Sequence, residues 1–258
     1  MVPVLKTLVI MISSKRRSHA QRHLNTFKAG INYAIVGLSG SGKSTLLKLM
    51  NGMMVPSRGT VLVEDCKPDQ RDRQFQKIMS RIGYIPQSLG LVRNSTVLDN
   101  VMMGALPRMR LMQFLLKRYS EEDLEEARRV LDKVGLLGKE DRKTYMLSGG
   151  EKRRVAIARA FMQGPRILLA DEIVSELDGT TSREIMNLVA DMQKDTRLTA
   201  VMIHHDIRLA LEFADRVAVI QEGRRVMELG VDNDTILDFQ SGDSTTQEIL
   251  EMYDDPKE

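Results

Sequence analysis

The sequence has 258 residues, a single cysteine and no tryptophan, and only 4% of its residues are aromatic. The one cysteine, Cys66, cannot form a disulfide within the chain, which is typical of a protein of the reducing cytosol. Lys and Arg number 38 and Asp and Glu number 35. A formal net charge of +3 gives no dominant basic field of the kind that a nucleic-acid partner requires. No internal repeat is visible, and the length suits one large domain or a domain with an inserted lobe.

Long hydrophobic runs are also missing. The apolar N-terminal run 1–12 is interrupted by Lys6 and is too short to cross a bilayer. A signal peptide carries its positive charge before the apolar part, whereas here the basic residues 15–17 follow it. We therefore expect a strand in 1–12 and no targeting segment. The basic cluster 15–23 is expected to face solvent or, alternatively, to touch anionic lipid.

The most informative stretch fits the pattern G-x-x-x-x-G-K-[ST] at every fixed position. It follows the apolar run 33–36, which suits a strand, and precedes 45–50, which suits a helix. In that setting, successive N–H groups and the helix N-terminus face one anion, whereas a plain Gly/Ser-rich turn is the alternative. Lys43 would reach the β- and γ-phosphates, and the Ser44 hydroxyl would hold Mg²⁺. The candidate phosphate-binding residues are Gly37, Leu38, Ser39, Gly40, Ser41, Gly42, Lys43, Ser44 and Thr45.

Strand and helix patterns alternate along the chain, which indicates an α/β core. Apolar runs at 82–85, 167–171 and 198–203 predict strands, and continuous apolarity is typical of parallel strands covered on both faces. A strand is expected at 61–63 and a hairpin at 217–227 with its turn at Glu222–Gly223. The remainder of 52–85 reads as turn and strand, with a polar segment at 65–74. The residues 231–258 show two weak helical patterns and an acidic end.

Residues 96–134 carry a helical pattern, and the clearest helix opens at Ser120 with the capping-box pattern [ST]-x-x-[DE]. Its apolar side comprises Leu124, Ala127, Val130, Leu131 and Val134. The preceding segment 109–116 is strongly apolar. It is expected to pack in the core or, alternatively, to form a docking surface for a partner helix.

Several weaker signals follow the phosphate loop in a fixed order. They are Gln87, the segment Leu147–Glu151, the apolar strand 167–171 followed by Glu172, the segment 175–178, and His205. Each alone is weak, since a histidine at a strand end or a Ser-Gly-Gly turn is usually structural. Together they resemble the nucleotide-binding subunit of ATP-binding cassette (ABC) transporters, over about residues 29–230. In that family these elements are the glutamine loop, the signature, the Walker B strand, the D-loop and the His switch.

The resemblance implies an α/β fold with a P-loop NTPase (RecA-like) core, an antiparallel β subdomain and an inserted helical subdomain. The ATP-binding core would comprise 1–90 and 163–230. The helical subdomain that bears the signature would comprise 91–162, and 231–258 would be a C-terminal extension.

The same resemblance implies roles for single residues. ATP and Mg²⁺ would be bound, with Ser44, Gln87 and Asp171 as metal ligands, and Glu172, Gln87 and His205 would serve catalysis. Ser148, Gly149, Gly150 and Glu151 would complete the nucleotide site of a second, head-to-tail copy, so a homodimer is implied.

The implied setting is transport. The chain would be a cytoplasmic ATPase, peripheral on the cytoplasmic face of the membrane, that binds transmembrane permease subunits and serves a solute-binding protein. The segments 89–106, 108–120 and 134–139 look most similar to phosphonate-type importers, which suggests a phosphonate or a related oxyanion as solute. Amino-acid and lipid-handling cassettes remain alternatives.

Some residues depart from the family pattern. No aromatic residue stands at 14–19, where a side chain that stacks on adenine is usual. Ile173 stands in place of a proline, Glu176 in place of a small residue and Glu151 in place of a glutamine. Two other functions are alternatives: a soluble cassette ATPase of DNA repair or translation, and a P-loop kinase or GTPase. The second leaves the signature unexplained and lacks an N-K-x-D guanine motif.

Overall fold

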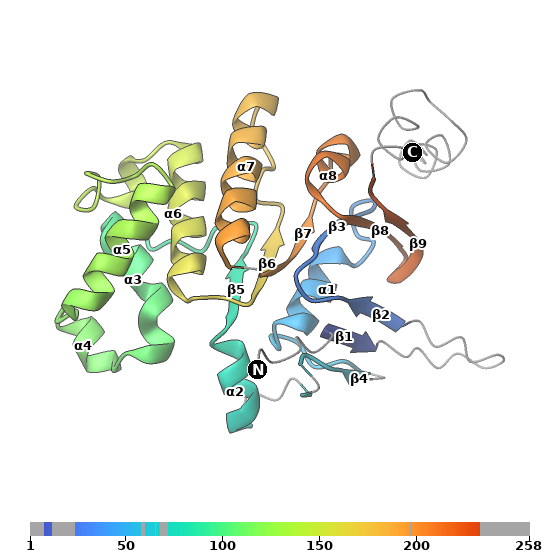
Figure 1. Ribbon diagram of the computed structural model, residues 1–258, viewed down its shortest axis with the longest axis horizontal. Coiled ribbons are helices and arrows are strands. Elements are labelled where there is room, and N and C mark those ends of the chain that lie inside the picture. Colours follow the sequence, from blue (N-terminus) through green and yellow to red (C-terminus); the bar gives the residue numbers. More distant parts are fainter. Residues whose placement is uncertain are drawn as a thin grey trace. The chain divides into compact units, whose positions relative to one another are not determined.

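The computed structural model describes residues 8–11, 24–57, 60–64, 66–67, 72–196 and 198–232. The chain forms two compact units: unit 1 comprises residues 1–69 and 200–258, and unit 2 comprises residues 70–199 (Figure 1). Within the described ranges, every helix is too short or too polar to cross a membrane. The basic cluster 15–23 and the helical patterns predicted beyond residue 232 lie outside the described residues.

The main strands of unit 1 pair in the order β7-β3-β8-β9. Strand β3 (Asn32–Val36) runs parallel to β7 (Thr199–Ile203) and to β8 (Arg216–Gln221). All of β7 and the four apolar residues of β3 and of β8 are buried, which explains why these strands contain runs of apolar residues. These strands confirm the predicted parallel core.

A hairpin joins β8 to β9 (Arg224–Gly230), and the two strands pair antiparallel. Its turn residues Glu222 and Gly223 have φ values of 48° and 73°. Two consecutive positive φ values match the twist of the flanking strands, so this turn favours a tight two-residue loop. The hairpin predicted at 217–227 is therefore confirmed.

A second, small sheet in unit 1 contains β2 (Leu24–Phe27), β1 (Leu8–Met11) and β4 (Thr60–Val61), in the order β2-β1-β4. Both pairings are antiparallel. The strand expected in 1–12 is present at β1. The strand expected at 61–63 is shorter than predicted, because Val63 leaves the sheet and forms an isolated bridge with Cys66.

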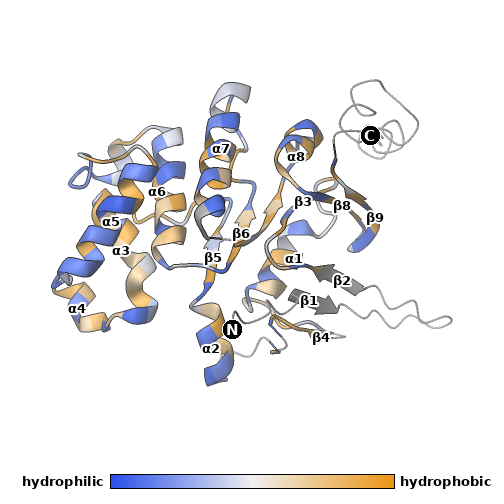
Figure 2. Ribbon diagram, in the orientation of Figure 1, coloured by the Kyte–Doolittle hydropathy of each residue, from blue (hydrophilic) through white to orange (hydrophobic). Residues whose placement is uncertain are grey.

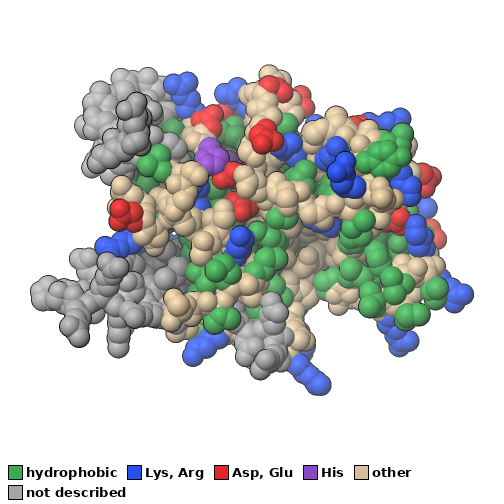
Figure 3. Space-filling model, turned by 180° about the vertical axis from the view of Figure 1, so that it is seen from behind, with side chains coloured by type: hydrophobic (Ala, Val, Ile, Leu, Met, Phe, Trp, Pro, Cys, Tyr) green, Lys and Arg blue, Asp and Glu red, His purple; other side chains and the backbone are tan. Residues whose placement is uncertain are grey.

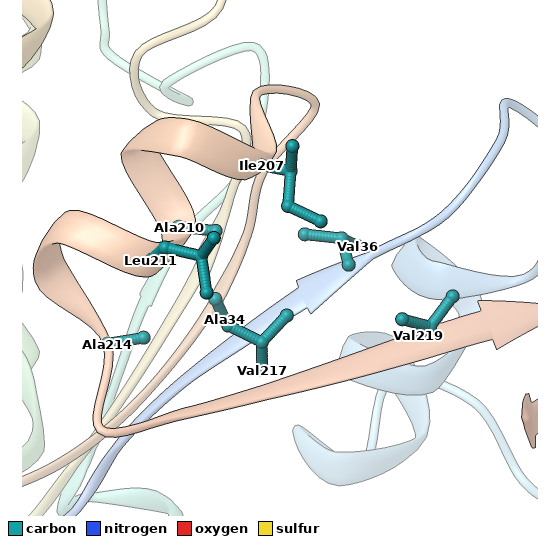
Figure 4. Packing of buried hydrophobic residues seen from close by; sticks show 8 residues of the cluster. All are labelled: Ala34, Val36, Ile207, Ala210, Leu211, Ala214, Val217 and Val219. Carbon is teal, nitrogen blue, oxygen red and sulfur yellow. The ribbon is translucent and has the colours of Figure 1, made fainter. Parts of the chain in front are cut away.

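Helix α8 (Ile207–Phe213) packs against β3 and β8 and closes one face of the unit 1 core. Ile207, Ala210 and Leu211 follow the three-and-four spacing of a helix face, so all three point at the strands (Figure 4). The side chains that they meet come from β3 and β8: Ala34, Val36, Val217 and Val219. This packing holds the carboxyl ends of β3 and β8 in place.

Unit 2 contains the parallel pair β5 (Ile82–Ile85) and β6 (Ile167–Asp171), both predicted from the sequence. Helix α2 (Arg73–Met79) precedes β5 and corrects the prediction of turn and strand for this region. The Asp72 side chain caps α2 by accepting a hydrogen bond from the Gln74 N–H at 2.8 Å. Phe75 and Ile78 are the buried residues of this helix, too few to give a readable period.

The other helices of unit 2 lie between β5 and β6 or after β6 (Figure 1). Side-chain caps open α3 (Val97–Met102) at Thr96, α5 (Glu121–Lys133) at Ser120 and α6 (Gly149–Met162) at Ser148. The cap predicted at Ser120 is thus confirmed. Figure 2 shows the largely hydrophilic outer surface of α5, whereas its buried side contains Ala127, Val130 and Leu131. The remaining elements are the short helices η1 (Met103–Arg108), α4 (Leu111–Leu115) and η2 (Thr144–Met146), and α7 (Gly179–Thr196).

Helix α4 corrects the expectation that the apolar segment 109–116 packs in the core. Leu111, Met112, Leu115 and Leu116 are each more than half exposed, and α4 contains no buried residue. Figure 3 shows hydrophobic side chains gathered on the surface at this end of unit 2. The docking-surface alternative therefore describes this segment better than the core interpretation does.

The contrast between α5 and α4 gives a prediction on stability. Leu131→Ala removes a fully buried side chain and is expected to lower the free energy of unfolding by about 2–5 kcal/mol. The matched change Leu115→Ala removes a side chain that is 62% exposed and is expected to stay within about 0.5 kcal/mol of wild type. Urea unfolding followed by circular dichroism compares the two variants. Equal losses would contradict the burial described here.

Candidate functional site

The phosphate loop, residues 37–45, connects β3 to helix α1 (Lys43–Met50) in unit 1. Gly40 and Gly42 have φ values of 79° and 102°, and Gly42 is the residue from which α1 starts. Residues with a Cβ rarely adopt such φ values, whereas glycine adopts them readily, and they let the loop curl around an anion. The first turn of α1 contains no acidic residue, so the positive end of the helix dipole there favours a bound phosphate.

Gly37 begins the loop in contact with the β8–β9 hairpin. A Cβ atom at position 37 would lie 2.2 Å from the carbonyl oxygen of Ile220, a backbone atom that cannot rotate away. The hairpin also supports the loop at its centre, because the Gly223 N–H donates to the Ser41 carbonyl at 2.7 Å. The glycine at position 37 is therefore required by the packing of unit 1 itself.

Lys43 lies at the start of α1 and is only 4% exposed. Its Nζ donates to the carbonyl oxygens of Gly37 at 2.7 Å and Leu38 at 2.9 Å, so the ammonium group lies inside the curl of the loop. The Ser41 hydroxyl beside it is buried and has no hydrogen-bond partner among the described residues. A buried ammonium group and a hydroxyl without a partner among the described residues fit the oxygens of a polyphosphate.

His205 follows β7, the parallel neighbour of β3. In that pairing Ile203 lies opposite Ile35, so His205 and Gly37 each stand two residues beyond a paired position, at the same edge of the sheet. The structure thus brings the predicted His switch to the edge where the phosphate loop begins. The preceding His204 is buried, and burial lowers its pKa to about 4, which leaves it neutral at pH 7.

The second group of predicted residues lies in unit 2, where β5 and β6 end. Ile85 pairs with Ala170, so Gln87 and Glu172 stand together two residues beyond. The Gln87 Nε2 donates to the Glu172 Oε2 at 2.7 Å, so these two predicted site residues are in direct contact. Asp171, the last residue of β6, is 4% exposed. An amide and two carboxylates therefore belong to residues at the carboxyl ends of two parallel strands, where such sheets place ligands.

The signature residues form the first turn of α6. The Ser148 hydroxyl accepts from the Glu151 N–H at 3.2 Å, and the Glu151 Oε2 accepts from the Ser148 N–H at 2.8 Å, which is a complete capping box. Ser148 and Gly149 are exposed. The helix start is therefore pre-shaped and accessible, as a surface that meets another molecule must be.

Glu151 is held by Lys139, whose Nζ donates to the Glu151 Oε1 at 2.6 Å. The hydrogen bond from Lys139, with the one from the Ser148 N–H, lowers the pKa of Glu151 to about 2. Lys139 was not among the predicted site residues, and its distance of twelve residues along the chain gives no local signal. Glu151 is thus a fixed carboxylate where glutamine is usual in the resembled family.

This pair makes stability depend on pH in acid. Because folding lowers the pKa of Glu151, its contribution is present above about pH 5 and is lost as the pH falls towards 2. We expect wild type to exceed Glu151→Gln by about 1 kcal/mol in free energy of unfolding at pH 7, as partly exposed ion pairs do. The difference should vanish near pH 2. Urea unfolding at both pH values measures this difference in free energy of unfolding. A difference that is larger at pH 2 than at pH 7 would contradict the prediction.

The segment 173–178 connects Glu172 to α7 and contains the predicted D-loop. Asp178 caps α7 by accepting from the N–H groups of Thr180 at 3.1 Å and Thr181 at 2.9 Å. These hydrogen bonds, together with one from the Thr181 hydroxyl at 2.7 Å, lower the pKa of Asp178. Asp178 therefore stays ionised, and its hydrogen bonds to the start of α7 fix the position of the end of this segment.

The aromatic residues of unit 1 nearest the phosphate loop in sequence do not offer a stacking surface for a base. Phe27 and Tyr33 are buried and pack edge to face, with ring centroids 4.8 Å apart. Residues 14–19 lie outside the described part of the chain. Tyr145, just before the signature, is 52% exposed.

The strand-loop-helix around Lys43 and the polar strand ends define an α/β protein of the P-loop nucleotide-binding class. The family model described as ABC transporter matches residues 22–175. The phosphonates import ATP-binding protein PhnC 3 of Halalkalibacterium halodurans is 39% identical over 196 residues, 75% of this chain and 76% of that protein. The phosphate-import ATP-binding protein PhnC of Mycolicibacterium smegmatis is 39% identical over 207 residues, 79% of each.

A solved structure agrees with these relatives. The dimeric post-hydrolysis state of the ATP-binding cassette MJ0796 bound to ADP and Pi has a TM-score of 0.69 and 29% identity. It covers 88% of this chain and 99% of that one. The chain therefore belongs to the ABC transporter family, which confirms the predicted fold class and the resemblance. It is an ATPase cassette of that family.

Proposed function

We propose that this chain is the subunit that binds and hydrolyses ATP for an importer of phosphonate or a related oxyanion. The observation that carries the proposal is the hydrogen-bonded pair Gln87–Glu172 at the ends of β5 and β6. In this pair the carboxylate that we propose as the catalytic base accepts a hydrogen bond from an amide, which supports the proposal. The relatives named as phosphonate and phosphate import proteins support the solute class. They give no support to a role in DNA repair or translation.

The phosphate loop would bind the triphosphate. Lys43 would exchange the carbonyls of Gly37 and Leu38 for the β- and γ-phosphate oxygens, and the N–H groups of residues 38–45 would surround them. His205 would stabilise the charge that develops on the γ-phosphate as its bond breaks.

Glu172 would act as the general base by polarising the attacking water, and Gln87 would orient that carboxylate. Mg²⁺, when bound, would neutralise charge on the phosphates. The hydroxyl of Ser44, the amide oxygen of Gln87 and the carboxylate of Asp171 are the hard oxygen donors that suit it. Among the described residues no three His, Cys, Asp or Glu side chains form a metal cluster.

The partners follow from the same proposal. Two copies would associate head to tail, so that Ser148, Gly149, Gly150 and Glu151 of one copy face the triphosphate on the other. The dimeric state of the MJ0796 cassette supports this arrangement. Transmembrane permease subunits and a solute-binding protein would complete the importer, with the chain peripheral on the cytoplasmic face. We propose 1–90 and 163–230 as the ATP-binding core, 91–162 as the helical subdomain and 231–258 as an extension.

Affinity purification of the full chain from detergent-solubilised membranes tests the proposal. We expect membrane subunits to co-purify, and the complex in lipid vesicles to hydrolyse ATP faster with methylphosphonate and a solute-binding protein present. Inorganic phosphate and an amino acid serve as comparison solutes. Co-purification with nucleic acid or ribosomes, and no membrane subunit, would refute the importer.

A further inference from the structure

We infer that Arg153 is a positioning residue for Glu172: it fastens the segment that follows Glu172 to the first turns of α6. The inference rests on the proposed function, because that function gives Glu172 its role. Arg153 lies on α6, two residues after the signature, and the carbonyl groups that it bonds lie in unit 2.

The guanidinium group of Arg153 bonds three carbonyl oxygens from two segments. Its Nε donates to the Ile173 carbonyl at 2.7 Å, and its Nη2 donates to the Ser175 carbonyl. Its Nη1 reaches the Gly149 carbonyl at 3.5 Å. One planar group thus bonds the residue directly after Glu172 and the residue that opens the D-loop, and touches the signature turn.

The backbone at Glu172 needs such support. Glu172 has a φ of 53°, and Glu176 has a φ of 64°, values that residues with long side chains rarely adopt. A conformation of this kind persists only where surrounding contacts fix it. Ser175 supplies two of these contacts, because its N–H and its hydroxyl donate to the Glu172 carbonyl at 3.1 Å and 2.9 Å. Arg153 holds Ser175 in turn, through the Ser175 carbonyl.

The direction of the Glu172 carboxylate depends on this conformation. Since φ at position 172 sets where the side chain leaves the backbone, relaxation to an ordinary negative φ would turn the carboxylate away from Gln87. Arg153 acts on that angle from both sides of the segment, at Ile173 and at Ser175. Arg153 also bonds the Gly149 carbonyl of the signature turn. A displacement of that turn would therefore change the backbone conformation at Glu172.

Only an arginine fits these contacts. A guanidinium group presents several N–H donors in a rigid plane, whereas a lysine ammonium acts as a single point. The neighbouring cation Lys152 provides the comparison, because its side chain makes no hydrogen bond or ion pair to any described residue. A positive charge on this turn is therefore not enough to fix the segment after Glu172.

The test compares Arg153→Gln, Arg153→Lys and the matched control Lys152→Gln in the full chain. We expect both Arg153 variants to lower kcat for ATP hydrolysis by about 10- to 100-fold, the size of loss that a misplaced catalytic group causes. The dissociation constant of a fluorescent ATP analogue should stay within about 2-fold, because the phosphate loop is untouched. Lys152→Gln should match wild type in both.

A double variant separates positioning from general damage. If Arg153 acts through Glu172, then Arg153→Gln added to Glu172→Gln should leave the residual rate of the single Glu172→Gln variant unchanged. A further loss of the same size as in wild type would overturn the inference, as would a wild-type kcat in Arg153→Gln. A wild-type rate in Glu172→Gln alone would instead overturn the proposed function and this inference together. Melting temperatures within about 2 °C of wild type are expected for all variants.

Discussion

Glu172→Gln is expected to lower the rate of ATP hydrolysis by about 10²–10⁴-fold, the usual contribution of general-base catalysis. Glutamine has the shape of glutamate, and its side-chain oxygen can still accept the hydrogen bond that Gln87 donates at 2.7 Å in the wild type. It cannot take a proton from water. The affinity for ATP should therefore persist while turnover is lost. Phosphate release at saturating ATP measures the turnover, and equilibrium dialysis with labelled ATP measures the affinity.

The control for this experiment is Glu125→Gln. Glu125 is an exposed residue of α5, and its loss removes the same charge without touching β5 or β6. Its turnover is expected to equal that of wild type. Should Glu172→Gln hydrolyse ATP as fast as Glu125→Gln does, Glu172 would not be the base.

Lys43→Ala is expected to raise the dissociation constant for ATP by about 10- to 150-fold, since hydrogen bonds to charged groups contribute about 1.5–3 kcal/mol. The buried ammonium group lies inside the phosphate loop and holds the carbonyls of Gly37 and Leu38. Its removal deletes the charge that the β- and γ-phosphates would meet. The binding of AMP, which lacks both phosphates, should change far less and provides an internal control.

Lys48→Ala is the matched variant for this test. Lys48 lies in the last turn of α1 and is exposed, so its removal should leave both nucleotide affinities unchanged. Circular dichroism of both variants shows whether α1 and its surroundings still form. Tight ATP binding by a folded Lys43→Ala protein would contradict the role of the phosphate loop.

The parallel strands could be predicted because burial on both faces requires apolar residues at successive positions. Strands β5, β6 and β7 are short unbroken runs of this kind. Helix α2 escaped prediction since its two buried residues lie in a polar context. Helix α4 has the composition of a core segment, and only the folded chain shows that its leucines face outward.

The candidate site divides in the same way. Residues in contiguous motifs, such as the phosphate loop, could be located because glycine, lysine and serine stand at fixed spacing. The pairing of Gln87 with Glu172 follows from strand order, which no single motif encodes. Contacts such as Lys139 with Glu151 and Arg153 with Ile173 join residues twelve and twenty positions apart. Side-chain reach between segments decides them, so the sequence alone gives no indication of either.

The contact between Gly37 and Ile220 has a consequence for genetic screens. Any side chain at position 37 would have its Cβ 2.2 Å from a backbone oxygen. Gly37 variants are therefore expected to fold poorly and not to accumulate in cells, rather than to accumulate as inactive protein. A mutational map of growth would score Gly37 and Lys43 as equally intolerant. Antibody quantification of each variant in cell extracts would tell them apart, since one position is required for the polypeptide to accumulate and the other for its use of nucleotide.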